Sequence, residues 1–159
     1  MRKPSFLLSV STLMLGLAAF TPASAQDQEV PYWASIRAEK VNMRVGPGVS
    51  FPIDWIYQRP GLPVKVVRVM QGWRLVRDPG GVQGWIVGRL LTRERGAIVI
   101  GEEPTEIRAE PSDSAEISWR VEPGVVGQLG DCDDRWCEFA VAGRSGWIAM
   151  SSIWGAGDP

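Results

Sequence analysis

The chain has 159 residues, of which 45% are hydrophobic, and it contains 18 Gly, 12 Pro, 8 Trp, 2 Cys and no His. The absence of His excludes the Ser-His-Asp and Cys-His nucleophile arrangements and every metal site that is built on imidazole. The formal net charge of −1 is the sum of a basic half and an acidic half of the chain.

Residues 1–25 have the pattern of a cleaved secretory signal peptide. Arg2 and Lys3 give a positive start, residues 6–20 form an apolar run, and residues 23–25 supply small side chains for cleavage. An uncleaved membrane anchor is the alternative, but the apolar run is short for a transmembrane helix. We therefore expect an exported protein, periplasmic or secreted, that has no membrane association after signal cleavage.

The sequence repeats itself at a spacing of 62 to 64 residues. Residues 41–47 align with residues 105–111, and four further groups follow in the same order. They are Trp55 with Trp119, Pro60-Gly61 with Pro123-Gly124, Trp73 with Trp136, and Gly84-Trp85-Ile86 with Gly146-Trp147-Ile148. The repeat predicts two copies of one small domain, at residues 33–93 and 97–154.

Short extended segments succeed one another in both repeats. Residues 64–69 are β-branched, residues 73–77 alternate between apolar and polar side chains, and residues 78–81 have the composition of a turn. Residues 84–87 restart an extended run. The second repeat keeps this order, and no window after residue 25 shows a sustained helical period. The pattern predicts an all-β fold of two small barrels in tandem.

Charge separates the two repeats. Residues 33–95 contain eleven basic and four acidic residues, a net charge of +7, whereas residues 96–159 contain four basic and twelve acidic residues, a net charge of −8. Two interpretations follow: the domains dock on each other through opposite fields, or the basic domain recognises an anionic component of the cell envelope. Docking is slightly favoured because a covalently linked partner is always present at high effective concentration.

Cys132 and Cys137 are the only cysteines. An exported protein meets an oxidising compartment, and a separation of five residues suits two cysteines that face each other across a short hairpin. Two thiolates alone are too few ligands for a structural metal site. We therefore expect a disulfide in the second domain, and neither a metal nor a cofactor.

These motifs resemble the bacterial SH3-like (SH3b) domain family, in its tandem exported form. Residues 41–48, Val-Asn-Met-Arg-Val-Gly-Pro-Gly, are similar to the opening N-x-R-x-G-P motif of the family, and Trp73 and Gly84-Trp85-Ile86 follow at similar positions. The resemblance covers nearly all of residues 33–154. It implies a pair of five- to six-stranded β-barrels that act as binding modules, often for peptidoglycan or peptides, and not as enzymes.

The second copy departs from this motif. Glu106 stands where the first copy has Asn42, and Ala109-Glu110 replaces Val45-Gly46. Glycine adopts backbone angles that other residues resist, so we expect the opening loops to differ in shape and the two domains to differ in what they bind.

The best candidate ligand-binding residues lie in the first domain: Asp54, Trp55, Tyr57, Trp73, Arg74 and Trp85. Aromatic rings in an SH3-like groove stack on peptides or on sugar faces. A structural role is the alternative for Trp73 and Trp85, because both recur in the second copy. Tyr57 aligns with Val121 and is therefore the more specific candidate.

Arg44 and Arg108 occupy one position of the repeat in domains of opposite charge. A shared Arg of this kind predicts the same internal hydrogen bonds in both copies, to loop carbonyls or to a carboxylate.

The sequence thus predicts an exported, non-catalytic module that recognises the cell envelope, with peptidoglycan or its peptide stems as the leading ligand. The alternative is a scaffold that binds another exported protein through its first domain. The acidic second copy and the exported location argue against nucleic acid as a partner. The second domain is expected to be a disulfide-stapled support.

Overall fold

The computed structural model describes residues 29–133 and 135–159, so the predicted signal peptide at residues 1–25 lies outside the described residues. The described chain is built from strands and two short 3₁₀ turns, which confirms the all-β prediction. No helix in these ranges is long and apolar enough to cross a membrane.

The first repeat forms one antiparallel sheet. Its strands are β1 (Tyr32–Ile36), β2 (Val41–Arg44), β3 (Ile53–Tyr57), β4 (Pro63–Met70), β5 (Trp73–Arg77), β6 (Gln83–Val87) and β7 (Leu91–Thr92), with the 3₁₀ turn η1 (Gly88–Leu90) before the last. The second repeat forms β8 (Gly96–Val99), β9 (Thr105–Arg108), β10 (Ile117–Val121), β11 (Val126–Cys132), β12 (Trp136–Val141), β13 (Arg144–Ala149), η2 (Met150–Ser152) and β14 (Ile153–Trp154).

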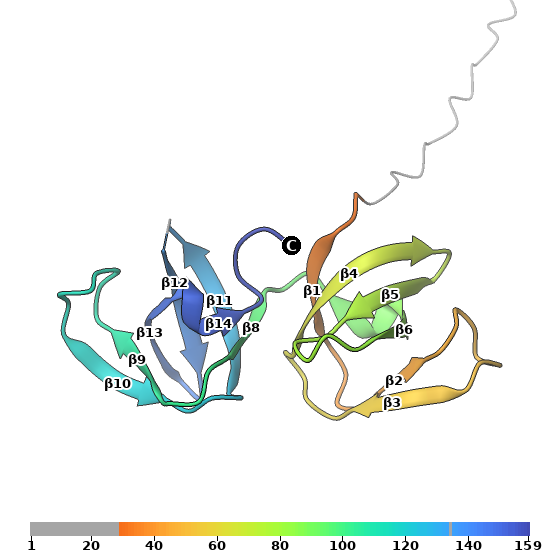
Figure 1. The fold of residues 1–159 in the computed structure, drawn as a ribbon, viewed down its shortest axis with the longest axis horizontal. Helices are drawn as coiled ribbons and strands as arrows, with labels where there is room; N and C mark the ends of the chain where they lie inside the picture. The colour runs from red at the N-terminus through yellow and green to blue at the C-terminus, as the bar shows by residue number, and fades with distance from the viewer. Residues whose placement is uncertain (1–28, 134) are drawn as a thin grey trace, which may run out of the picture.

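The two sheets have the same topology (Figure 1). The order β3-β2-β6-β5-β4-β1-β7 in the first matches β10-β9-β13-β12-β11-β8-β14 in the second, strand for strand. Each sheet has seven strands, more than the five or six that the family resemblance implied. The excess comes from the two-residue strands β7 and β14, which pair with β1 and β8 and extend each sheet by one strand.

Alternation along the strands builds each core. In β4, Val64 and Val66 are fully buried, while Lys65 between them is only partly buried, because successive side chains of a strand point to opposite faces. The equivalent strand β11 buries Leu129, and its partner β12 buries Phe139. Apolar side chains thus fill the space inside each curled sheet, and the polar positions form its outer face.

Aromatic rings and hydrogen bonds join the two barrels. The ring of Trp33 lies edge-on to that of Trp154, with centroids 4.7 Å apart, and its Nε1 donates to the carbonyl oxygen of Gly157 at 2.9 Å. A guanidinium nitrogen of Arg59 donates to the carbonyl oxygen of Gly124 at 2.7 Å. These contacts place β1 beside β8, as Figure 1 shows between the two barrels.

Gly96, at the start of β8, makes this joint possible. Its N–H donates to Ser35 Oγ at 2.9 Å. A Cβ at this position would collide with the carbonyl oxygen of Gly61 and lie 2.9 Å from Ser35 Oγ. The two backbones therefore approach each other at a distance that only glycine permits.

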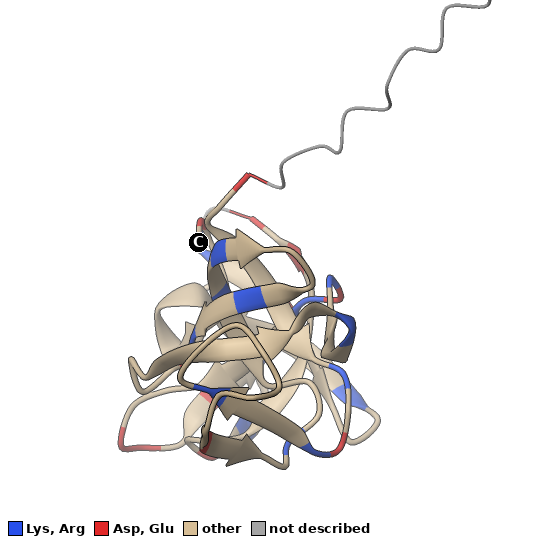
Figure 2. Ribbon diagram, turned by 90° about the vertical axis from the view of Figure 1, so that its right-hand side faces the viewer, with Lys and Arg blue, Asp and Glu red and all other residues tan. Residues whose placement is uncertain are grey.

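Charge is distributed unevenly on this frame. Figure 2 looks onto the first repeat and shows basic positions on its strands and loops. Among the described residues, the ion pairs join Arg108 and Arg120 to Glu106, and Arg135 to Asp113, all inside the second repeat. The joint itself consists of ring contacts, hydrogen bonds and the apolar packing of Ile98 and Val126 against the core of the first repeat. Docking driven by opposite net charge therefore stays a prediction.

The predicted disulfide is confirmed. Cys132 and Cys137 are bonded across the hairpin between β11 and β12, with Cα atoms 4.0 Å apart. At the tip, Asp133 Oδ1 accepts hydrogen bonds from the backbone N–H groups of Arg135 and Trp136 at 3.0 and 2.8 Å, which lowers the pKa of this carboxyl. The Asp133 carboxylate thus stabilises the turn of the hairpin.

Replacing Cys132 and Cys137 together by Ser opens a small loop and should lower the free energy of unfolding by about 2 kcal/mol. Binding through the first repeat should persist, because the hairpin belongs to the second barrel. Urea unfolding followed by Trp fluorescence measures the loss of stability. Unchanged stability, or abolished binding by protein that is still folded, would contradict this division of roles.

Candidate functional site

One arginine in each repeat braces the loop of its own long hairpin, β2–β3 in the first and β9–β10 in the second. The guanidinium of Arg44 donates to the carbonyl oxygen of Phe51 at 2.6 Å, and that of Arg108 donates to the carbonyl oxygen of Ala115, also at 2.6 Å. Arg108 additionally pairs with Glu106 at 2.6 Å. The equivalent hydrogen bonds confirm the structural role that the repeat predicted for this residue pair.

The hairpin of the first repeat carries Asp54 and Trp55 on strand β3. Both are exposed, and 58% of Trp55 is accessible to solvent. Trp85 comes from β6, which pairs with β2 opposite Arg44, and only 8% of it is exposed. Of the two tryptophans, Trp55 therefore has by far the more accessible ring.

Tyr57 closes the same strand but points into the core. It is 5% exposed, its hydroxyl donates to Asp78 Oδ2 at 2.9 Å, and Met43 Sδ lies 3.5 Å away. Burial, the hydrogen bond and the charge of Asp78 raise the pKa of Tyr57. Asp78 Oδ1 also accepts from the N–H of Val82, so Tyr57 ties the β5–β6 turn to β3. Its role in ligand contact stays a prediction.

Trp73 and Arg74 lie at the beginning of β5, and Leu75 of that strand is the residue that pairs with Trp85. Trp73 is partly buried opposite Val87 and Met70. Arg74 Nε donates to the hydroxyl of Tyr32 at 3.0 Å, and its guanidinium also donates to the carbonyl oxygens of Gln71 and Trp73.

Arg74 lines a small hollow of about 160 Å³ on this side of the barrel. Arg93 lines it too, with its guanidinium 3.5 Å from the centre of the Tyr32 ring. The predicted contact residues are therefore dispersed: Asp54 and Trp55 lie on the exposed hairpin and Arg74 lines the hollow. Tyr57 and Trp85 are buried, and Trp73 is partly buried.

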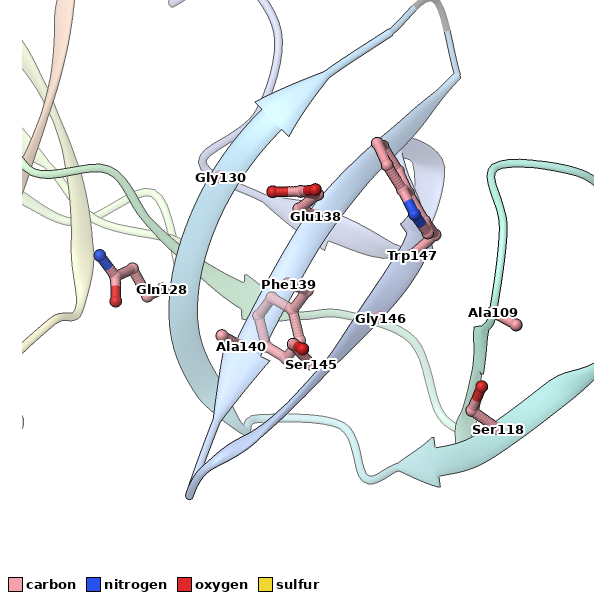
Figure 3. A pocket seen from close by; sticks show the side chains of 10 residues that line it. All are labelled: Ala109, Ser118, Gln128, Gly130, Glu138, Phe139, Ala140, Ser145, Gly146 and Trp147. Atoms are coloured by element: carbon pink, nitrogen blue, oxygen red, sulfur yellow. The ribbon is translucent and has the colours of Figure 1, made fainter.

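The second repeat has a groove that sequence reasoning missed. It has a volume of about 460 Å³ and lies between the β9–β10 hairpin and the outer face of β11, β12 and β13 (Figure 3). Its lining consists of Ala109, Ser118, Gln128, Gly130, Glu138, Phe139, Ala140, Ser145, Gly146 and Trp147. The repeat offset places Ser118 and Trp147 at the positions of the candidates Asp54 and Trp85.

Trp119, the repeat partner of Trp55, is held down beside this groove. Its Nε1 donates to the carbonyl oxygen of Ser145 at 3.4 Å, and the guanidinium of Arg144 lies 4.6 Å from its ring centre. The first repeat has Gln83 at the Ser145 position, and Trp55 there keeps an exposed ring. The equivalent tryptophans of the two hairpins thus differ: Trp119 is hydrogen-bonded and covered by Arg144, whereas the ring of Trp55 is exposed.

Metal chemistry has no evident place in the described part of the chain. Within residues 29–133 and 135–159, no group of three or more Cys, Asp or Glu side chains is arranged to hold a metal ion. Both cysteines are joined in the disulfide.

Replacing Tyr57 by Phe removes the hydrogen bond to Asp78 and should lower the free energy of unfolding by about 1 kcal/mol at neutral pH. The pKa of Tyr57 is raised in the native state, so its protonated phenol contributes stability below about pH 10. This contribution is lost as the pH rises further, because the phenol of the unfolded chain releases its proton first. The variant should therefore lose less stability than the wild type between about pH 7 and pH 11. Parallel pH slopes in urea unfolding would contradict this.

Three comparisons place the chain among known proteins. A family model described as "Bacterial SH3 domain" matches residues 37–92 and 101–155. The protein named "Putative N-acetylmuramoyl-L-alanine amidase YrvJ" of Bacillus subtilis (strain 168) is 24% identical over 169 residues, covering 99% of this chain and 32% of that protein. The chain thus spans about a third of the length of this curated relative.

Among solved structures, NlpC2 from Trichomonas vaginalis is 16% identical with a TM-score of 0.36, covering 79% of this chain and 48% of its own. An NlpC/P60 family protein from Bacillus cereus ATCC 10987 is 13% identical with a TM-score of 0.34, covering 77% of this chain and 56% of its own. The family model matches each of the two sheets once. The chain therefore belongs to the bacterial SH3 domain family and contains two tandem copies of that domain.

Proposed function

We propose that this protein is an exported, non-catalytic module that binds peptidoglycan or its peptide stems through its first SH3 domain. The observation that carries the proposal is the exposed ring of Trp55, 58% accessible on a hairpin whose loop is braced by the Arg44 hydrogen bond. A rigidly held, solvated indole is a ready stacking platform for a sugar face or a peptide.

Apolar neighbours extend this platform. Val45, Phe51, Ile53 and Ile56 on the same hairpin are between 40% and 58% exposed. Exposed apolar side chains that gather on one hairpin mark an interaction site more often than scattered single residues do. We call the surface formed by these four residues and Trp55 the hairpin face.

Electrostatics favours an anionic ligand for the first domain. Its net charge of +7 over residues 33–95 raises the local concentration of anions, and peptidoglycan stems carry carboxylates. Arg74 and Arg93, which meet at Tyr32, supply guanidinium groups of the kind that bind carboxylates in a bidentate manner. The ligand would then be bound by aromatic stacking at the hairpin face and by charged groups elsewhere on the barrel.

The comparisons support the envelope assignment at a coarser level. The curated relative is named as an amidase, and the solved structures are named as NlpC and NlpC/P60 proteins. This chain spans 32% of the amidase, so we transfer no activity from it. The absence of His in the sequence adds to the argument for binding without catalysis.

A protein partner is the second candidate. The hairpin face is aliphatic as well as aromatic, with Ile53 at 45% and Ile56 at 40% exposure, which also suits the core of a protein–protein interface. In that case the ligand would be another exported protein, and the wall polymer itself would not be bound.

Replacing Trp55 by Ala should reduce binding to purified peptidoglycan sacculi by roughly fivefold or more, because a stacking contact is worth about 1 to 3 kcal/mol. Co-sedimentation across a salt series measures the loss. Ile117→Ala is the matched control, because Ile117 is 39% exposed on the equivalent hairpin of the second domain. It should bind as the wild type does.

Absence of saturable sedimentation by the wild type at low salt would refute wall binding. Crosslinking in an envelope extract, with capture that depends on Trp55, would then support the protein partner. Circular dichroism of every variant separates loss of binding from loss of fold.

A further inference from the structure

The groove of the second domain continues into the joint between the domains. A cleft of about 440 Å³ at the joint is lined by residues of both domains and of the segment that links them. Gln128 and Ala140 line the cleft and the groove alike, and they are paired across β11 and β12. In Figure 3, Gln128 lies on the side of the groove nearest the ribbon of the first domain.

Small side chains keep this surface open. In the first domain the matching outer face holds large groups: Lys65 Nζ lies 5.2 Å from the ring centre of Trp33, and the guanidinium of Arg77 lies 2.9 and 3.2 Å from the terminal amide of Gln83. The matching positions of the second domain are Gly96, Gln128, Ala140 and Ser145. We call the groove and the cleft together the open face.

The two ends of the open face carry opposite charges. Glu138 lines the groove end; it is exposed and has no hydrogen bond or ion pair with any residue of the described ranges. Arg37 and Arg95 line the cleft end, where Glu94 is the one acidic residue. The cleft end therefore has a net positive charge and the groove end a net negative charge.

Arg95 is poised for an anion. One of its terminal nitrogens donates to the carbonyl oxygen of Gly155 at 2.6 Å, but its buried Nε has no partner among the described residues. Burial lowers the pKa of this guanidinium. A partly buried guanidinium that lines a cleft is stabilised by a carboxylate that enters the cleft beside it.

We propose that the open face binds a short peptide, with its ammonium group at Glu138 and its carboxylate at Arg37 and Arg95. Glu138 is two residues along β12 from Ala140, and Ala140, Gln128 and Gly96 stand on adjacent strands. Standard sheet spacings put the two ends about 12 Å apart. An extended peptide spans about 3.3 to 3.6 Å per residue, so three or four residues fit.

This site is separate from the hairpin face. It gives the second domain a ligand of its own, whereas the sequence predicted a supporting role alone. Its validity does not rest on wall binding by the first domain, because the two surfaces share no residue.

Calorimetric titration with tetra-alanine, with its N-acetyl form and with its C-terminal amide tests the proposal. The free peptide should bind saturably, and blocking either end should weaken binding roughly fivefold, as expected for the loss of an exposed charge pair. Glu138→Gln should weaken binding of the free peptide by the same factor. It should also abolish the difference in affinity between the free and the acetylated peptide. Arg37→Gln should reduce the discrimination against the amide, because Arg95 remains as the second partner of the carboxylate.

Two further variants locate the site. Ala140→Arg/Ser145→Gln installs the side chains of the first domain and should abolish binding, while Glu122→Gln, an exposed acid elsewhere in the second domain, should leave it unchanged. Absence of saturable binding by the folded wild type, wild-type affinity in the filled variant, or equal affinity for all three peptides would each overturn the proposal.

Discussion

In each domain, one hydrogen bond from an arginine to a loop carbonyl braces the long hairpin that carries or borders a candidate site. Arg44 and Arg108 donate at the same distance, 2.6 Å, to Phe51 and Ala115, which are themselves repeat partners. Each bond closes the loop between the two strands of its hairpin. The braced hairpin bears Trp55 in the first domain and forms one wall of the groove in the second.

On this shared scaffold, the two copies have diverged at a few outward positions. The first copy leaves a tryptophan uncovered on its hairpin and fills its outer face with long side chains. The second covers the equivalent tryptophan with Arg144 and empties the outer face by means of Gly96, Ala140 and Ser145. Opposite net charge follows the same division, which is the pattern expected of two sites for two chemically different ligands or parts of one ligand.

Much of the fold was predictable because it depends on local patterns. The repeated Gly-Trp-Ile anchors, the alternation in residues 73–77 and the cysteine spacing each report on a short segment, and the structure confirms the barrels and the disulfide. The sites depend on register between distant strands. The Tyr57 hydroxyl can be buried because Asp78, 21 residues away, accepts its hydrogen bond, and the groove runs on toward the joint where Ala140 lies opposite Gln128. No periodicity in the sequence encodes either pairing.

The central claim is that the first domain touches the wall polymer with its hairpin. Backbone and indole NMR shifts of the ¹⁵N-labelled chain, titrated with enzymatically solubilised peptidoglycan fragments, test it most directly. We expect saturable shifts of the Trp55 indole and of the amides in residues 45–56, with the β5 and β6 core strands unmoved. Shifts that leave this hairpin unchanged while other surfaces respond would contradict the account.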